Sequence, residues 1–261
     1  MGLQFNDIIY DKKDGVARIT LNRPETYNAF TDKTLREMIY AFNDAGLDNT
    51  IGVVVLTGAG DKAFCSGGDV TWEREGGLER LRTEPLDVHA AMRHCLKPII
   101  ARVNGYAIGA GNHIAYMSDF TLAADHAIFG QNGPRVGSPA GGYIVSYLVR
   151  VVGAKKAREI WMLSRRYTAR EALEMGLVNA VVPYARLDAE VDKWCEEILA
   201  LSPTCLKILK ASFEAEYDYL RGQTTQFQRM LAPDFFSSGE GLEGATAFLE
   251  RRRPDFSHFR R

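Results

Sequence analysis

The sequence lacks any large excess of positive or negative charge. Its 261 residues include 32 lysines and arginines against 33 aspartates and glutamates, which gives a formal net charge of −1. Such a balance supplies no net electric field that would draw the chain to nucleic acid or to an anionic membrane. We therefore expect neither a nucleic-acid partner nor a membrane partner.

Paired cysteines and membrane-length apolar runs are also absent from the sequence. The four cysteines at positions 65, 95, 195 and 205 show no CxxC spacing, which argues against a zinc site and against a disulfide framework. No apolar run reaches the roughly 18 residues of a membrane helix, and the N-terminus does not resemble a secretory signal. We expect reduced thiols, no bound metal and a cytoplasmic location.

What the chain does have is the composition of a globular protein, with 46% hydrophobic and 25% charged residues. Residues 16–22 alternate like a half-buried strand. Residues 51–57 and 98–103 are short apolar runs rich in β-branched side chains, typical of buried parallel strands. A helical pattern begins at Thr34, where Glu37 completes a predicted capping box. This order of elements predicts right-handed βαβ units and an α/β core.

The C-terminal third is predicted to be helical. Thr168 with Glu171 matches a capping box, and Gly176 lies where a left-handed C-terminal residue belongs. The apolar side chains of residues 227–236 favour packing either on the chain's own core or on a neighbouring subunit. Helical spacing extends over residues 142–151, 154–163, 169–175, 187–200, 203–219 and 240–251.

Two glycine-rich segments, residues 63–69 and 104–111, each follow a predicted strand. Small residues there let a ligand approach the main chain, and free N–H groups can point outward. The second segment leads into an apolar helix, whose N-terminus adds unsatisfied donors. Two donors converging on one oxygen would form an oxyanion hole for a thioester carbonyl. Taken singly, each segment is equally compatible with a tight turn after a strand.

Together and in this order, the two segments resemble those of the crotonase (enoyl-CoA hydratase/isomerase) superfamily, and the resemblance covers nearly the whole chain. It implies an α/β fold with a crotonase-like ββα spiral core, expected over residues 1–200 with the acyl-CoA site. A helical C-terminal region over residues 201–261 would serve in trimerisation and as a lid on CoA. Further matching segments are Asn22-Arg23-Pro24, Asn28-Ala29-Phe30, Phe129-Gly130-Gln131, Thr168 to Gly176 and Arg253-Pro254-Asp255-Phe256.

The resemblance also implies a ligand and an assembly. The substrate would be a CoA thioester, no redox cofactor would be needed, and the protein would form a homotrimer or homohexamer. The oxyanion donors would be the N–H groups of Gly68 and Ala110. Other ligand contacts are expected from Asn28, Ala29, Lys62, Ala63, Ser66, Gly67, Asp69 and Phe256.

The hydratase subtype can be tested position by position, because adding water to an enoyl-CoA needs two carboxylates. The two glutamates of hydratases would fall at His113 and Gly133, so simple hydration is not expected. Residues 129–138 and 153–161 look instead like 1,4-dihydroxy-2-naphthoyl-CoA synthase. In one branch of that family, bicarbonate held near a glutamine and a tryptophan replaces the acid, and Gln131, Gly133 and Trp161 match that trio. The alternative is that Trp161 is simply a core aromatic residue and Gln131 a loop amide.

A second similar family is 2-ketocyclohexanecarboxyl-CoA hydrolase, which opens a ring carbon–carbon bond beside a β-keto thioester. The pairing of Gly111 with Asn112, and His89 ahead of Arg93, look more like this hydrolase. Both reactions pass through a thioester enolate, so the sequence separates them poorly. His89 is a candidate base, although a histidine on a surface helix is often inert.

The sequence departs from both families at one position. An aspartate usually follows the glycine–serine pair, and here that position is Ala140, which cannot carry a proton. A tyrosine of the synthase aligns with Phe236, which has no hydroxyl. The candidate replacements are Ser138, Tyr143, His113, His89 or an anion bound at Gly133.

Residues 70–88 contain Trp72, two adjacent glycines and eight charged side chains, which indicates either a loop over the acyl end of the site or a plain solvated connection. Three functions stay open. The first is carbon–carbon bond chemistry on a cyclic or aromatic 3-oxoacyl-CoA. The second is an isomerase, hydratase or thioesterase with atypical acid/base residues. The third is a catalytically silent acyl-CoA-binding homologue.

Overall fold

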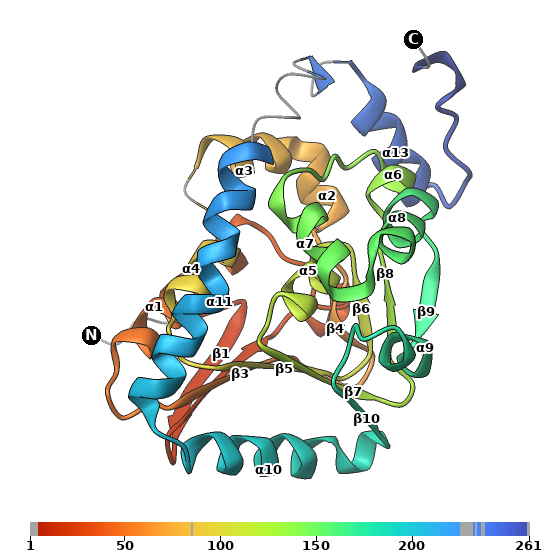
Figure 1. Ribbon diagram of the computed structural model, residues 1–261. Helices are drawn as coiled ribbons and strands as arrows, with labels where there is room; N and C mark the ends of the chain where they lie inside the picture. Colours follow the sequence, from red (N-terminus) through yellow and green to blue (C-terminus); the bar gives the residue numbers. More distant parts are fainter. Residues whose placement is uncertain (1–4, 85, 225–231, 233, 236–237, 260–261) are drawn as a thin grey trace.

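The strands of the computed structural model form two sheets (Figure 1), and the model describes residues 5–84, 86–224, 232, 234–235 and 238–259. Within these residues, the larger sheet has the order β1 (Ile8–Lys13), β2 (Val16–Leu21), β3 (Val53–Gly58), β5 (Ile99–Val103), β7 (Phe120–Ala124) and β10 (Ala180–Val182). The smaller sheet has the order β4 (Ala63–Cys65), β6 (Tyr106–Ile108), β8 (Ile128–Gly130) and β9 (Arg166–Thr168).

Each turn of the chain contributes one strand to each sheet. The strands β3, β5 and β7 pair in parallel in the larger sheet, while β4, β6 and β8 pair in parallel in the smaller one. The predicted strands at 16–22, 51–57 and 98–103 correspond to β2, β3 and β5. This alternation is the ββα spiral that the sequence predicted.

The central strand β3 is buried on both faces, which explains its continuous apolar run. Val54 and Leu56 face the main core beside α1 (Asp32–Leu47), whereas Val53 and Val55 pack with α10 (Leu187–Leu199) on the opposite face. Figure 1 shows α10 lying across that outer face of the sheet. A strand covered by helices on both sides needs apolar residues at every position.

The remaining helices connect and cover the two sheets. They are η1 (Pro24–Thr26), α2 (Val70–Trp72), η2 (Glu73–Gly77), α3 (Leu78–Thr83), α4 (Val88–His94), α5 (Ala110–Tyr116), α6 (Gly133–Val136), α7 (Tyr143–Val152), α8 (Ala154–Leu163), α9 (Ala169–Glu174), η3 (Tyr184–Arg186), α11 (Pro203–Thr224), α13 (Glu240–Leu249) and η5 (Ser257–Phe259).

The predicted start of the first helix was wrong by one turn. The helix begins at Asp32 with Thr31 as its N-cap, and Thr34 is the partner that completes the capping box. Glu37 accepts hydrogen bonds from the backbone N–H groups of Asp7 (2.8 Å) and Ile8 (3.1 Å), so its carboxylate fixes the N-terminal strand to the helix. A local pattern could not reveal a partner about thirty residues away.

The helical prediction for the C-terminal third is confirmed in the described residues. The capping box of Thr168 and Glu171 is present, and Gly176 has a φ of +77°. The long helix α11 is joined to the core by buried charge, because the ammonium group of Lys210 lies 2.8 Å from the carboxylate of Asp119. Residues 227, 230, 231 and 236, which figured in the prediction for the tail, lie outside the described residues. Among the described helices, none has the length and apolar character needed to cross a membrane.

Candidate active site

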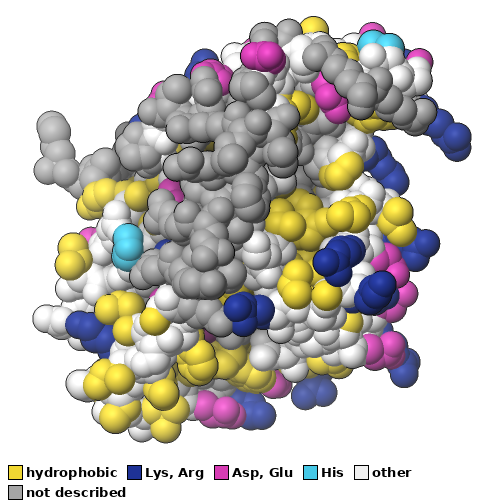
Figure 2. All heavy atoms as spheres, turned by 45° about the horizontal axis from the view of Figure 1, so that its top comes forward, with side chains coloured by type: hydrophobic (Ala, Val, Ile, Leu, Met, Phe, Trp, Pro, Cys, Tyr) yellow, Lys and Arg dark blue, Asp and Glu magenta, His cyan; other side chains and the backbone are white. Residues whose placement is uncertain are grey.

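One cavity of about 1340 Å³ lies where the two glycine-rich segments meet the helices α2, α5, α6 and α7. Phe248 and Leu249 of α13 also border it, so the C-terminal region contributes to its wall. Figure 2 views the molecule with the top of Figure 1 brought forward. Acidic and basic side chains are interspersed over the described part of this face, as the balanced composition leads one to expect.

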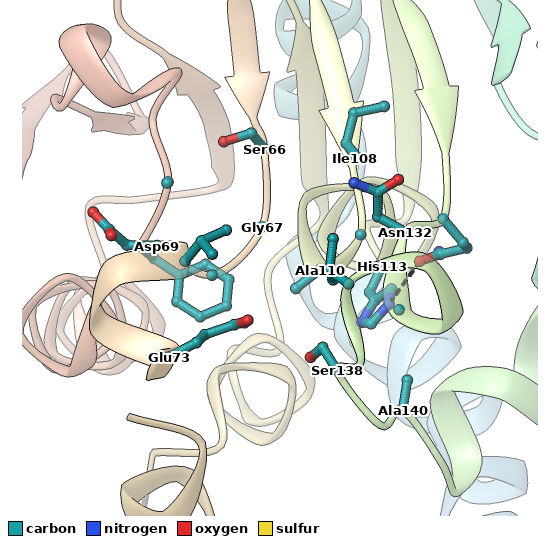
Figure 3. Close-up of a pocket in the computed structure, with 18 of the residues that line it drawn as sticks. Ser66, Gly67, Asp69, Glu73, Ile108, Ala110, His113, Asn132, Ser138 and Ala140 are labelled. Carbon is teal, nitrogen blue, oxygen red and sulfur yellow. Dashed lines mark hydrogen bonds between the residues drawn. The ribbon is translucent and has the colours of Figure 1, made fainter. Parts of the chain in front are cut away.

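The structure brings most of the residues singled out from the sequence to this cavity (Figure 3). All six residues proposed for catalysis line it, namely Gly68, Ala110, Ser138, Tyr143, His89 and His113. Seven of the proposed ligand contacts also line it, namely Ala29, Ser66, Gly67, Asp69, Gln131, Gly133 and Trp161.

Four of the proposed ligand contacts, Asn28, Lys62, Ala63 and Phe256, do not line this cavity. The amide of Asn28 donates to the carbonyl oxygens of Ala59 (3.0 Å) and Ala63 (2.7 Å), so it braces the loop. Lys62 borders a second, smaller cavity of about 440 Å³. Their roles as ligand contacts stay predictions.

Glycine is required where the two segments approach each other. Gly67 has a φ of +98°, and a Cβ there would lie 3.4 Å from the nitrogen of Ala110. At Gly111 a Cβ would lie 2.0 Å from the carbonyl oxygen of Cys65, far inside van der Waals contact. The glycines therefore let the two main chains pack directly against each other.

The backbone N–H groups of Gly68 and Ala110 donate no hydrogen bond among the described residues. Their neighbours are engaged: the N–H of Asp69 donates to the oxygen of Phe30 (2.9 Å), and the N–H of Gly109 donates to the oxygen of Gly130 (2.9 Å). Ala110 is the first residue of α5, where an N–H has no partner within the helix. Both free donors border the same cavity, so a ligand can accept from them.

A second group of polar side chains lies beside α5. The Nε2 atom of His113 is 3.2 Å from Oε1 of Gln131, and the ring of His113 lies 5.1 Å from that of Trp161. Nε2 of Gln131 and Nε1 of Trp161 are buried, and neither has a hydrogen-bond partner in the described part of the chain. Because unpaired buried donors are costly, this pair is suited to a ligand oxygen.

His113 is expected to stay neutral through the physiological range. Burial lowers the pKa of His113 to about 3, and the neighbouring His89 adds to the shift. We expect ¹⁵N NMR at pH 5 to show a neutral imidazole for His113. Since unfolding raises this pKa towards 6.5, the unfolding free energy should fall as the pH drops from 6.5 towards 3. A charged imidazole at pH 5 would contradict this description of the site.

His89 and Tyr143 face the same cavity from α4 and α7. The hydroxyl of Tyr143 donates to Oδ1 of Asp87 at 3.4 Å, and Asp87 also caps α4 by accepting from the N–H of Ala90. Burial lowers the pKa of His89, and the charge of Asp87 opposes that shift. His89 therefore lines the cavity, and its role as a base stays a prediction.

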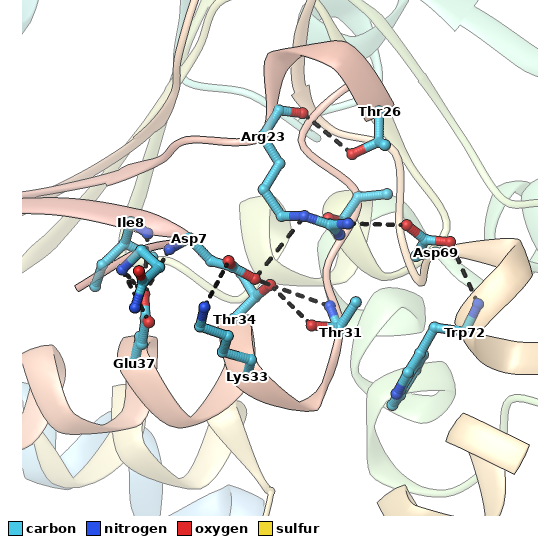
Figure 4. Close-up of polar contacts among 12 residues, drawn as sticks. Asp7, Ile8, Arg23, Thr26, Thr31, Lys33, Thr34, Glu37, Asp69 and Trp72 are labelled. Atoms are coloured by element: carbon cyan, nitrogen blue, oxygen red, sulfur yellow. Dashed lines mark hydrogen bonds and ion pairs between the residues drawn. The ribbon is translucent and has the colours of Figure 1, made fainter. Parts of the chain in front are cut away.

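The segment 70–88, interpreted from the sequence as a loop, is largely helical in its described residues. Asp69 caps α2 by accepting from the N–H of Thr71 (3.0 Å), and Arg23 holds the same carboxylate at 3.1 Å. Nε1 of Trp72 donates to Asp32 at 2.8 Å. Figure 4 shows Arg23, Asp69 and Trp72 side by side. These long-range contacts explain why the local sequence did not predict the helices.

Sequence reasoning missed Glu73, whose carboxyl group borders the cavity. Burial raises the pKa of Glu73 to about 7, and the nearby Asp69 carboxylate adds to the shift. Glu73 follows the cap residue Asp69 by four positions, a spacing that would have indicated proximity had the segment been recognised as a helix.

The structure also defines the surroundings of positions 133 and 140, where the resemblance led us to expect acidic residues. Ala140 borders the cavity and supplies no acid there. A Cβ at Gly133 would lie 2.7 Å from the carbonyl oxygen of Ser138, so a glutamate at this position would require the chain to shift. The described site thus lacks the pair of glutamates that hydration needs at positions 113 and 133.

The fold and the cavity together define a crotonase-type protein, and comparisons with known proteins agree. A model of the family described as enoyl-CoA hydratase/isomerase matches residues 11–259. The chain belongs to this family, within the crotonase superfamily, and an acyl-CoA substrate is consistent with it.

Solved structures similar to this chain carry related names. An enoyl-CoA hydratase from Mycobacterium avium subsp. paratuberculosis K-10 is 29% identical, with 97% of this chain and 100% of that chain covered and a TM-score of 0.82. An enoyl-CoA hydratase/isomerase from Xanthobacter autotrophicus Py2 is 34% identical, with 95% and 93% covered and a TM-score of 0.76. A monofunctional enoyl CoA isomerase from M. smegmatis is 31% identical, with 81% and 94% covered and a TM-score of 0.69.

Proposed function

We propose that this protein makes or breaks a carbon–carbon bond beside the thioester of a cyclic or aromatic 3-oxoacyl-CoA. The thioester oxygen accepts hydrogen bonds from the N–H groups of Gly68 and Ala110, which stabilise the enolate that forms when the bond breaks or when the α-carbon is deprotonated. The observation that carries the proposal is the pair of unpaired N–H groups that border one cavity. Donors fixed before the reaction stabilise developing negative charge most effectively.

The unpaired donors near His113 support the finer part of the proposal. Nε2 of Gln131 and Nε1 of Trp161 are buried and have no described partner, as a site for a small oxyanion requires. Gly133 lines the same cavity as these two residues, and the two unpaired donors would hold bicarbonate there. When bound, bicarbonate would supply a base that the chain lacks at positions 133 and 140.

Trp161→Phe tests the bicarbonate site, because it keeps an aromatic ring and removes one donor. We expect the variant to lose stimulation by bicarbonate and to turn over about 10- to 100-fold more slowly, the worth of one hydrogen bond to an anion. Trp194→Phe is the matched control, since Trp194 donates to Glu190 on α10, outside the cavity. Equal stimulation of Trp161→Phe and the wild type would exclude the site.

The reaction itself is tested with two substrates. Purified protein is incubated with 2-ketocyclohexanecarboxyl-CoA and with o-succinylbenzoyl-CoA, each with and without bicarbonate, and the products are identified by mass spectrometry. Hydrolytic ring opening or ring closure supports the proposal. Neither product, under conditions where the protein binds both thioesters, rejects carbon–carbon bond chemistry on these substrates.

A second candidate is an isomerase, hydratase or thioesterase that acts on another acyl-CoA through atypical acid/base residues. The similar solved structures, which include a monofunctional isomerase, favour it. Double-bond migration in a 3-enoyl-CoA, followed by absorbance of the conjugated thioester, would establish this alternative. A catalytically silent homologue would bind acyl-CoA in calorimetry and give no product in any of these assays.

We also propose assembly as a homotrimer or homohexamer and a cytoplasmic location, as the resemblance to the superfamily implies. Sedimentation of the purified protein tests the assembly directly. A monomer at micromolar concentration would reject it.

A further inference from the structure

Four carboxylates border the main cavity, and three of them are engaged by other groups of the chain. Asp69 binds Arg23 and caps α2. Glu84 forms an ion pair with Arg36. Asp87 caps α4 and accepts from Tyr143. The fourth is Glu73, whose carboxylate has no hydrogen-bond or ion-pair partner among the residues that the structure describes.

The carboxyl group of Glu73 lies against Gly68, the residue that carries one of the two N–H donors. A Cβ built on Gly68 would be 2.2 Å from Oε1 of Glu73, so this oxygen occupies the space beside the glycine. Glu73 is the first residue of η2, and Figure 3 shows its side chain extending into the cavity, towards the side where Ala110 and Ser138 lie. An acyl group whose oxygen is held at Gly68 and Ala110 would place its α-carbon close to this carboxyl group.

The backbone that carries Glu73 is fixed from several directions. The N–H of Glu73 donates to the oxygen of Asp69 at 2.8 Å, and Asp69 is itself held by Arg23. The preceding residue, Trp72, is buried, and its indole donates to Asp32 at 2.8 Å. A side chain on such a support keeps its position during a reaction, which proton transfer requires.

We propose that Glu73 is a catalytic residue that exchanges a proton with the α-carbon of the bound acyl group. This inference rests on the proposed enolate function and adds an acid/base group of the chain's own to the base that bound bicarbonate would supply. Burial raises its pKa towards neutrality, so both protonation states are accessible near pH 7.

The proton balance is the same in both directions of carbon–carbon chemistry. In ring opening, water adds to the ring ketone and releases one proton to solvent, and the bond from that carbon to the α-carbon breaks. The ketone carbon becomes a carboxylic acid, and the electron pair passes to the thioester enolate. Protonated Glu73 then gives its proton to the α-carbon and is left as a carboxylate, which regains a proton from solvent. In ring closure, the Glu73 carboxylate takes the α-proton and the α-carbon attacks the carbon of a carboxylic acid, which loses hydroxide; the hydroxide takes a proton from solvent and leaves as water.

The test uses a thioester that can enolise but has no ring ketone to attack. Cyclohexanecarboxyl-CoA is incubated in D₂O with the purified full chain, and ¹H NMR follows the loss of its α-proton signal. We expect Glu73→Gln to slow this exchange by about 10²- to 10⁴-fold, the usual contribution of a positioned acid or base. Glu73→Asp, which keeps a carboxyl group, should recover part of the rate.

Glu75→Gln is the matched control, because Glu75 is an exposed residue of η2 that does not border the cavity. It should exchange at the wild-type rate. Calorimetry of cyclohexanecarboxyl-CoA binding shows whether Glu73→Gln keeps an intact site. If Glu73→Gln binds the thioester and exchanges its α-proton at the wild-type rate, Glu73 is not the group that transfers the proton. The proposed enolate function would still stand in that case. No exchange by the wild type would overturn the enolate function itself.

Discussion

Replacing Ala110 by proline is expected to lower the rate of α-proton exchange on bound cyclohexanecarboxyl-CoA by about 10²- to 10³-fold. The substitution removes the N–H group that the account assigns to the thioester oxygen. Proline is well tolerated at the first position of a helix, because the N–H lost there has no partner in the helix. Ala110 occupies that position in α5. The loss should therefore appear in catalysis and not in stability.

Ala154→Pro is the matched control for this experiment. Ala154 is the first residue of α8, follows a glycine N-cap as Ala110 does, and is exposed outside the cavity. Its variant should exchange and melt like the wild type. If Ala110→Pro and Ala154→Pro exchange at the same rate, the N–H of Ala110 does not stabilise the enolate.

Adding a methyl group at Gly111 is expected to have the second largest effect. The Cβ would lie 2.0 Å from the oxygen of Cys65, which is main chain and cannot rotate away. The two glycine-rich segments must then separate. Overpacking of this kind lowers the unfolding free energy by about 1–3 kcal/mol, and a displacement near 1 Å at a reacting group slows reactions about 10²-fold. Urea unfolding and the exchange assay measure the two effects.

The stability effect has its own control in Gly141→Ala. A Cβ at Gly141 meets no atom within 4 Å, so the unfolding free energy should change by no more than about 0.5 kcal/mol. Equal stability of the Gly111 and Gly141 variants would mean that the contact between the segments is not tight.

Three strands of the larger sheet, β2, β3 and β5, and the C-terminal helices were predictable because their signals are local. The strand β3 is apolar from Val53 to Leu56, β5 is apolar apart from Arg102, and α9 carries its capping box in its own sequence. The strands of the smaller sheet, such as β4 and β6, are three residues long, too short to show a periodicity. The positions of these strands are set by their pairing with strands from the neighbouring turns of the spiral, and not by their own composition.

The part of the candidate site that consists of backbone N–H groups was predictable from the sequence. The resemblance of the two glycine-rich segments singled out Gly67, Gly68 and Gly111. The structure places Gly67 and Gly68 at one cavity and packs Gly111 against the main chain of Cys65. Glu73 was not found, because it lies in a polar segment whose helices depend on contacts with Arg23 and Asp32. Phe236, which aligns with a tyrosine of the synthase, lies outside the described residues.

A crystal structure of the protein with cyclohexanecarboxyl-CoA bound tests the central claim most directly. We expect the thioester oxygen to lie within about 3 Å of the nitrogen atoms of both Gly68 and Ala110. A thioester bound elsewhere, or one whose oxygen accepts from neither amide, would contradict it.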